Sequence, residues 1–234
     1  MMPRFRLAHV AGWWVVGFLA SNTAVVIYLV ASGRAGLDDP LAGAPLSADA
    51  FFQAALWIGL AGGPIVLSRR FGRGSLAQDY GWTLRGRSIA PALGAGLLTQ
   101  LVIIPILYIP IFWLVGDADL SEDARALTDR AANGLDVAVL VLVVVIGAPL
   151  VEELFFRGLL WEALRERGLS TGPAVAVTSV LFGVAHFQLL QLPALVAFGA
   201  VAAVLRARTG GLTAPIAAHV MFNAITVAQL LVLD

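Results

Sequence analysis

The chain has 234 residues, of which 59% are hydrophobic, and its mean hydropathy is +0.88. This apolar fraction is far above that of a soluble domain and indicates a membrane protein with several spans, so the lipid bilayer is its first expected partner. The 15 basic and 15 acidic residues cancel, which gives no reason to expect a nucleic-acid partner. With no cysteine, disulfides, thiolate metal sites and cysteine nucleophiles are excluded.

The apolar runs predict an all-α bundle of about seven transmembrane helices, with six to eight as the range. In chain order the expected spans are 10–31, 50–67, 88–115, 135–167, 174–190, 193–205 and 215–232. Pro91, Pro105 and Pro110 predict that the third span is kinked or divided. The fourth is longer than a bilayer is thick, so its last turns should project into water.

Arginine placement predicts the orientation. All basic residues are arginines, as in a bacterial protein with a biased genome composition, and they gather around 4–6, 69–87, 165–167 and 206–208, in alternate connections. The intervening connections carry most of the aspartates. Positive residues stay inside, so we expect a multi-pass protein of the plasma membrane with a cytoplasmic N-terminus. Within one integral domain, 1–134 should form N-terminal spans and 135–234 a catalytic core.

Two adjacent carboxylates, Glu152 and Glu153, end the apolar run from 135 to 150. A charge at bilayer depth costs at least about 2.5–3.5 kcal/mol, so such residues usually mark a working site. Neighbours on a helix point about 100° apart. Glu153 precedes Arg157 by four residues, the favourable order for an ion pair, which leaves Glu152 to face other helices. Glu152 is therefore the candidate for chemistry, and a structural Glu–Arg clamp at a helix end is the alternative.

Three further polar side chains interrupt the later apolar runs: His186, His219 and Asn223. His219 and Asn223 are four residues apart and share one helix face. Glu152 and His186 lie at equal distances along the chain from a turn at Leu169, so an antiparallel helix pair would hold them level. We expect all four groups to meet in one cavity that opens toward the cytoplasmic half of the membrane.

These residue types suit hydrolysis. A carboxylate beside an imidazole can take a proton from water, which fits Glu152 and His186. An imidazole and an amide on one face, His219 and Asn223, can donate to an oxyanion, at about 2.7–4 kcal/mol per donor. Glu152, His186 and His219 can instead bind a divalent metal such as Zn²⁺. A mechanism with a bound metal and one without a cofactor both stay open, although the chain lacks an H-E-x-x-H helix.

Three segments resemble one family. Glu152 to Gly158 matches its E-E-x-x-F/Y-R-G motif, Phe182 to His186 matches F-x-x-x-H, and His219 to Asn223 matches H-x-x-x-N. Together they resemble the CPBP intramembrane proteases, which include the type II CAAX prenyl endopeptidases and the bacterial Abi proteins.

The resemblance implies an all-helical membrane core that hydrolyses bonds of a peptide or protein substrate. It implies water activation by Glu152 with His186, oxyanion stabilisation by His219 and Asn223, and support from Glu153 and Arg157. Two other functions stay open. A transporter or proton-relay protein also keeps buried Glu and His, although the sequence shows no repeated halves. A non-catalytic membrane scaffold can bind a partner through the same cavity.

Overall fold

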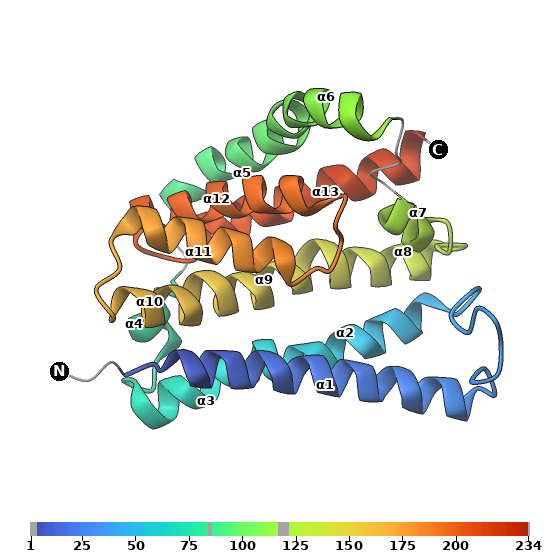
Figure 1. Cartoon of the computed structure of the whole chain (residues 1–234), viewed down its shortest axis with the longest axis horizontal. Coiled ribbons are helices and arrows are strands. Elements are labelled where there is room, and N and C mark those ends of the chain that lie inside the picture. The colour runs from blue at the N-terminus through green and yellow to red at the C-terminus, as the bar shows by residue number, and fades with distance from the viewer. Residues whose placement is uncertain (1–3, 84–85, 117–121, 234) are drawn as a thin grey trace.

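The computed structural model describes residues 4–83, 86–116 and 122–233. Within these ranges the chain forms helices and no strand, which confirms the predicted all-α class (Figure 1). The helices run back and forth along one long axis. In Figure 1 the first three helices form a layer on one side of the remaining ones.

The helices alternate in direction from one span to the next. In chain order they are α1 (Leu7–Ala31), α2 (Leu46–Leu60), α3 (Gly62–Phe71), α4 (Leu76–Tyr80), α5 (Ile89–Leu98), α6 (Ile104–Val115), α7 (Glu122–Thr128), α8 (Gly134–Leu140), α9 (Ala148–Glu153), α10 (Trp161–Arg165), α11 (Thr171–Val184), α12 (Leu192–Thr209) and α13 (Thr213–Leu233). One 3₁₀ turn, η1 (Gly86–Ser88), and three π-helical segments, η2 (Thr99–Ile103), η3 (Val141–Gly147) and η4 (Leu154–Leu160), join some of them.

Six continuous helical runs in the described residues are long and apolar enough to cross a membrane. They are 7–31, 46–71, 86–113, 134–165, 192–209 and 213–232. With the shorter apolar helix α11, they make a multi-pass membrane protein of about seven spans, as the sequence predicted.

Helix α11 is shorter than the expected span 174–190. It has 14 residues and ends at Val184, so its length of about 21 Å falls short of the ~30 Å hydrocarbon core. Phe187, with a φ of 56°, adopts the left-handed conformation that a bulky residue rarely takes, and it interrupts the helix. The connection 185–191, which carries His186, therefore lies within the depth of the bundle, where Figure 1 shows α11 ending beside α9.

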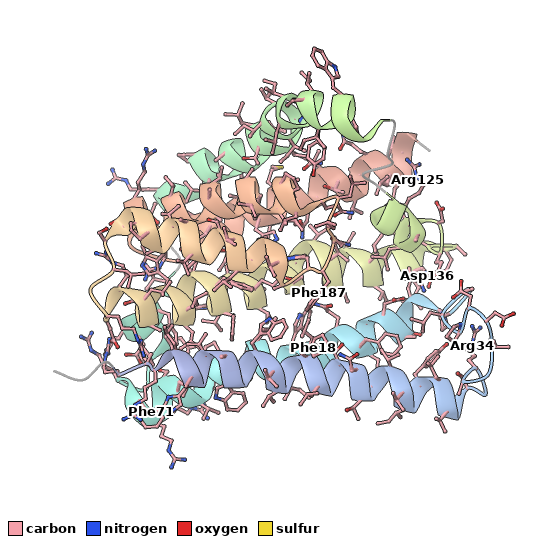
Figure 2. All side chains as sticks on the ribbon, in the orientation of Figure 1. Phe18, Arg34, Phe71, Arg125, Asp136 and Phe187 are labelled. Atoms are coloured by element: carbon pink, nitrogen blue, oxygen red, sulfur yellow. The ribbon has the colours of Figure 1, made fainter. Side chains whose placement is uncertain are left out.

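Phe187 is anchored to the first span. Its ring lies 5.7 Å from that of Phe18 and 6.0 Å from that of Trp14, both on α1, and Figure 2 labels the Phe18–Phe187 pair. These aromatic contacts accompany the unusual backbone conformation of the connection.

The fourth span is one continuous helix from 134 to 165, but its turns are not uniform. The single α-helical run α9, which ends in Glu152 and Glu153, lies between the π-helical segments η3 and η4. Wider π turns are common at functional sites because they rotate the following side chains relative to a regular helix. In the third span, the π-helical segment η2 comes shortly before Pro105, in agreement with the predicted distortion.

Small residues bring the helices around the site into close contact. A Cβ on Gly96 would lie 2.2 Å from the carbonyl oxygen of Ala218, so α5 lies directly against α13. A Cβ on Gly199 would lie 3.0 Å from the Cα of Ser179, so α12 lies directly against α11. Larger side chains at either glycine would force the helices apart.

The bundle has two chemically different ends. The N-terminus, α3, α4 and α10 lie at one end in Figure 1, here called the arginine-rich end, and α7 and the C-terminus lie at the other, the acidic end. Figure 2 labels Phe71 at the former and Arg34, Arg125 and Asp136 at the latter. At the arginine-rich end, Arg4 pairs with buried Asp79 at 3.1 Å and with Glu166 at 2.6 Å.

Candidate active site

Glu152 lies at the centre of the polar cluster. Its Oε2 is 3.9 Å from Nε2 of His186 and 4.0 Å from Nε2 of His219. The predicted proximity of Glu152 and His186 is confirmed, at a separation that is too long for a direct hydrogen bond. Two hydrogen bonds of about 2.7–2.8 Å to one water molecule would span such a gap.

Both imidazole rings are oriented by their other nitrogen. Nδ1 of His186 donates to the carbonyl oxygen of Phe182 at 2.8 Å, because a carbonyl can only accept. Nδ1 of His219 donates to Oε1 of Glu153 at 2.9 Å. In the neutral rings the Nε2 lone pairs therefore face Glu152.

Glu153 is fully buried and does not line the cavity that Glu152 faces. Its Oε1 accepts a hydrogen bond from Nη1 of Arg157 at 3.0 Å, and both side chains are 0% exposed. The predicted i,i+4 pair is thus confirmed. Arg157 also donates from Nη2 to the carbonyl of Gly199 at 2.9 Å, and its guanidinium lies 4.5 Å from the ring centroid of Phe182. Because the same Oε1 receives His219, Glu153 connects the arginine to an imidazole of the cluster.

Asn223 lies one turn beyond His219 on α13. Its Nδ2 donates to the carbonyl oxygen of Val144 at 2.8 Å, within the π-helical segment η3. A side-chain amide carries two N–H donors, so this bond fixes the amide and leaves a second N–H for another acceptor.

A cavity of about 830 Å³ brings these groups together. Glu152, His186, His219 and Asn223 all line it, so the structure places the four predicted site residues around one space. The rest of the lining is mainly apolar with several amides, and it continues as far as Asp49 on α2.

The expected direction of the cavity was wrong. From Glu152 the lining continues to Thr128 on α7 and Leu230 near the end of α13, which are at the acidic end. Toward the arginine-rich end the space is filled, because the side chains of 154–161 are all buried. Counting residues from the turns predicted the depth of Glu152 in the bundle. It could not predict on which side of Glu152 the space is filled, because that depends on the packing of large residues such as Phe156 and Trp161.

The cluster does not have the spacing of a zinc site in this arrangement. Two ligands about 2.0–2.1 Å from a tetrahedral zinc ion lie roughly 3.3 Å apart. The separations from Glu152 to the two imidazoles are 3.9 and 4.0 Å. Within the described ranges, no three His, Asp or Glu side chains form a group that could hold a metal ion.

Two residues that support or line the site were not identified from the sequence. Arg206 was counted among the topogenic arginines, but it is buried and donates from Nε to the carbonyl of Arg157 at 2.9 Å and from Nη2 to Glu162 at 2.6 Å. Its place inside the last turn of an apolar helix was the available signal. Gln100 lines the cavity from η2, and an isolated glutamine in a Pro-broken span carried no such signal.

Known proteins are similar in sequence to the part of the chain that carries the site. Residues 134–225 match the family described as "Type II CAAX prenyl endopeptidase Rce1-like". The "Putative membrane peptidase YdiL" of Bacillus subtilis (strain 168) is 33% identical over 116 residues, which cover 50% of this chain and 46% of that protein. An "Uncharacterized 24.3 kDa protein" of Escherichia coli is 40% identical over 88 residues, which cover 36% of this chain and 41% of that protein.

The aligned segments therefore span less than half the length of these curated relatives. No solved structure matches the chain significantly. The matched region contains all three motifs and the four cavity residues from which the resemblance was predicted. Residues 134–225 are thus similar to the Rce1-like type II CAAX prenyl endopeptidases, which supports the resemblance to the CPBP family that the three motifs predicted.

Proposed function

We propose that the chain is an intramembrane endopeptidase that hydrolyses peptide bonds of membrane-associated or membrane-entering substrates. Residues 135–233 form its catalytic core, and Glu152 is the general base. The observation that carries this proposal is the convergence of two oriented Nε2 atoms on one carboxylate oxygen, at 3.9 and 4.0 Å, inside a cavity.

In the proposed reaction a water molecule lies between Glu152 and His186. Glu152 takes a proton from the water as the oxygen attacks the substrate carbonyl carbon, while Nε2 of His186 accepts the water's second hydrogen and orients it. The carboxylic acid formed on Glu152 then gives its proton to the leaving amide nitrogen as the C–N bond breaks. The proton taken from water is thus returned to the product amine, and Glu152 is again a carboxylate at the end of the cycle.

The oxyanion formed by the attack needs donors on the other side of the carbonyl. Asn223 supplies its second amide N–H. His219, whose Nδ1 is bonded to Glu153, supplies Nε2–H when the ring carries both protons. Each donor of this kind contributes about 2.7–4 kcal/mol to the transition state.

The test is peptide hydrolysis by the purified protein in lipid vesicles, with a library of transmembrane peptides as substrates and mass spectrometry of the products. Glu152→Gln keeps the shape of the side chain but removes the base, so turnover should fall at least about 10²–10⁴-fold. Glu166→Gln, which removes a carboxylate that pairs with Arg4 at the arginine-rich end, is the matched control and should retain turnover. Equal activity of Glu152→Gln and wild type would overturn the proposal.

A further inference from the structure

The part of the cavity beyond Glu152 is larger than a water molecule requires. It extends from the glutamate to the acidic end, between α2, η2–α6, α7, α12 and α13. The volume of the whole cavity, about 830 Å³, falls within the range of about 300–1,000 Å³ that is usual for ligand pockets. We call the part of the lining between Glu152 and the acidic end the entrance.

Carboxamides are the main polar groups of this entrance. They are Gln53, Gln100, Gln188, Gln191, Asn223 and Gln229. A carboxamide offers both donors and an acceptor, as a peptide bond does, so this lining is suited to an extended peptide backbone. Among the described residues, the Oε1 atom of Gln100 is buried and has no hydrogen-bond partner. Leaving such an acceptor unpaired costs about 1–3 kcal/mol, which a substrate N–H would recover.

The entrance also has a preferred charge. Its lining contains the carboxylates Asp49 and Glu152 and, among the described residues, neither arginine nor lysine, although Asp49 pairs with Arg130 outside the lining at 2.8 Å. Among the described residues, this end contains Asp38, Asp39, Asp49, Glu122, Asp123, Asp129 and Asp136 against Arg34, Arg125 and Arg130. The resulting negative potential attracts basic segments and repels acidic ones.

We propose that the substrate enters from the acidic end, as an extended peptide whose basic residues lie next to an apolar stretch, and that Gln100 binds its backbone. This inference rests on the proposed endopeptidase function and adds the route and the substrate class. If the arginine-rich end faces the cytoplasm, the route begins at the outer face of the membrane.

The absence of cysteine makes the route directly measurable. Single substitutions Gln53→Cys and Ala148→Cys place a thiol in the outer and inner parts of the cavity. Asp38→Cys and Arg69→Cys mark the exposed acidic and arginine-rich ends. Each variant is reconstituted in vesicles and treated with a membrane-impermeant thiosulfonate, added either outside or trapped inside.

Both cavity thiols should react from the side on which Asp38→Cys reacts, and not from the side of Arg69→Cys. Reaction from the arginine-rich side, or no reaction from either side while Asp38→Cys is labelled, would overturn the route. The readout does not depend on turnover, so its failure is distinguishable from failure of the catalytic assignment, which the Glu152→Gln assay tests separately.

The substrate class is tested by protection of Ala148→Cys. Two peptides with the same apolar stretch, one with a Lys-Lys-Lys flank and one with a Glu-Glu-Glu flank, compete with the reagent. The lysine peptide should slow labelling more than the glutamate peptide, and 0.5 M salt, at which the Debye length is roughly 4 Å, should reduce the difference. Equal protection, or stronger protection by the glutamate peptide, would overturn the preference for basic segments.

Gln100→Leu removes the proposed backbone acceptor without changing the charge. It should weaken protection by the lysine peptide about 2- to 10-fold, the effect of one hydrogen bond. Gln78→Leu, on the exposed surface of α4, is the control and should leave protection unchanged. Unchanged protection in the Gln100→Leu variant would remove Gln100 from the binding site.

Discussion

Glu152 and Glu153 are neighbours of the same residue type, and the bundle gives them opposite environments. Glu152 faces a cavity, where its nearest ionisable partners are imidazole nitrogens at 3.9 and 4.0 Å. Glu153 is sealed against Arg157 at 3.0 Å and His219 at 2.9 Å, with no exposed surface. One carboxylate thus has room for water and substrate, while the other is held by two fixed partners at Oε1 and has its Oε2 buried without a hydrogen-bond partner.

The contrast shows how a membrane protein can keep two carboxylates at one depth. A buried ion pair barely compensates the cost of removing both charges from water, so the Glu153–Arg157 pair adds little net stability. Its effect is geometric, since it holds η4 against α12 through Gly199 and fixes the ring of His219. On the cavity side, the less constrained Glu152 is the group that we propose for proton transfer.

The largest expected effect comes from breaking the buried Glu153–Arg157 ion pair. Arg157→Met leaves Glu153 buried without its cation and should lower the free energy of unfolding by about 3–5 kcal/mol. The double variant Glu153→Gln/Arg157→Met removes both charges and should recover much of this loss. Unfolding in mixed micelles measures both, and a double variant no more stable than Arg157→Met would show that packing rather than charge is decisive.

Glu153→Gln separates the two carboxylates more finely. It weakens the bonds to Arg157 and His219, so stability should fall by about 1–3 kcal/mol and turnover by about 10- to 100-fold through the misplaced imidazole. Glu152→Gln should reduce turnover further, with unfolding within about 0.5 kcal/mol of wild type. If the two variants lost stability equally, the distinction between a chemical and a structural carboxylate would fail.

A smaller loss of stability is expected from substitution of Arg206, which bonds to the backbone of Arg157. In Arg206→Lys, the lysine cannot bond to both the carbonyl of Arg157 and Glu162 as the arginine does. The substitution should lower the free energy of unfolding by about 1 kcal/mol. Arg208→Lys, two residues away and exposed, is the control. The measurement is the melting temperature in detergent, and equal melting temperatures of the two variants would show that Arg206 does not support η4.

No effect is expected from metal removal. The distances around Glu152 suit a bridging water rather than a tetrahedral zinc ion, so excess chelator should leave turnover within about twofold of the untreated enzyme. A loss of turnover that zinc restores would show that the three side chains close around a metal in the active protein. Glu152 would then be a ligand instead of the base.

Local patterns predicted most of the fold. Apolar runs of bilayer length need only hydropathy, so the all-α class and about seven spans followed from the sequence, and the Glu153–Arg157 pair followed from its i,i+4 spacing. The end of α11 could not be predicted, because neither glycine nor proline follows Val184 before Pro193, and a tertiary contact of Phe187 with α1 accompanies the break.

The sequence by itself determined which residues are available at one depth: Glu152, His186, His219 and Asn223 come from three motifs on separate segments. Only the tertiary structure decided how they point. The π-helical segments η3 and η4 change the directions of the side chains on the fourth span from those of a regular helix. The carbonyl of Gly199 fixes the position of the Arg157 guanidinium. The bond from His219 to Glu153 and the direction of the cavity depend on these changes. They arise from packing between distant helices, which residue spacing along one helix does not contain.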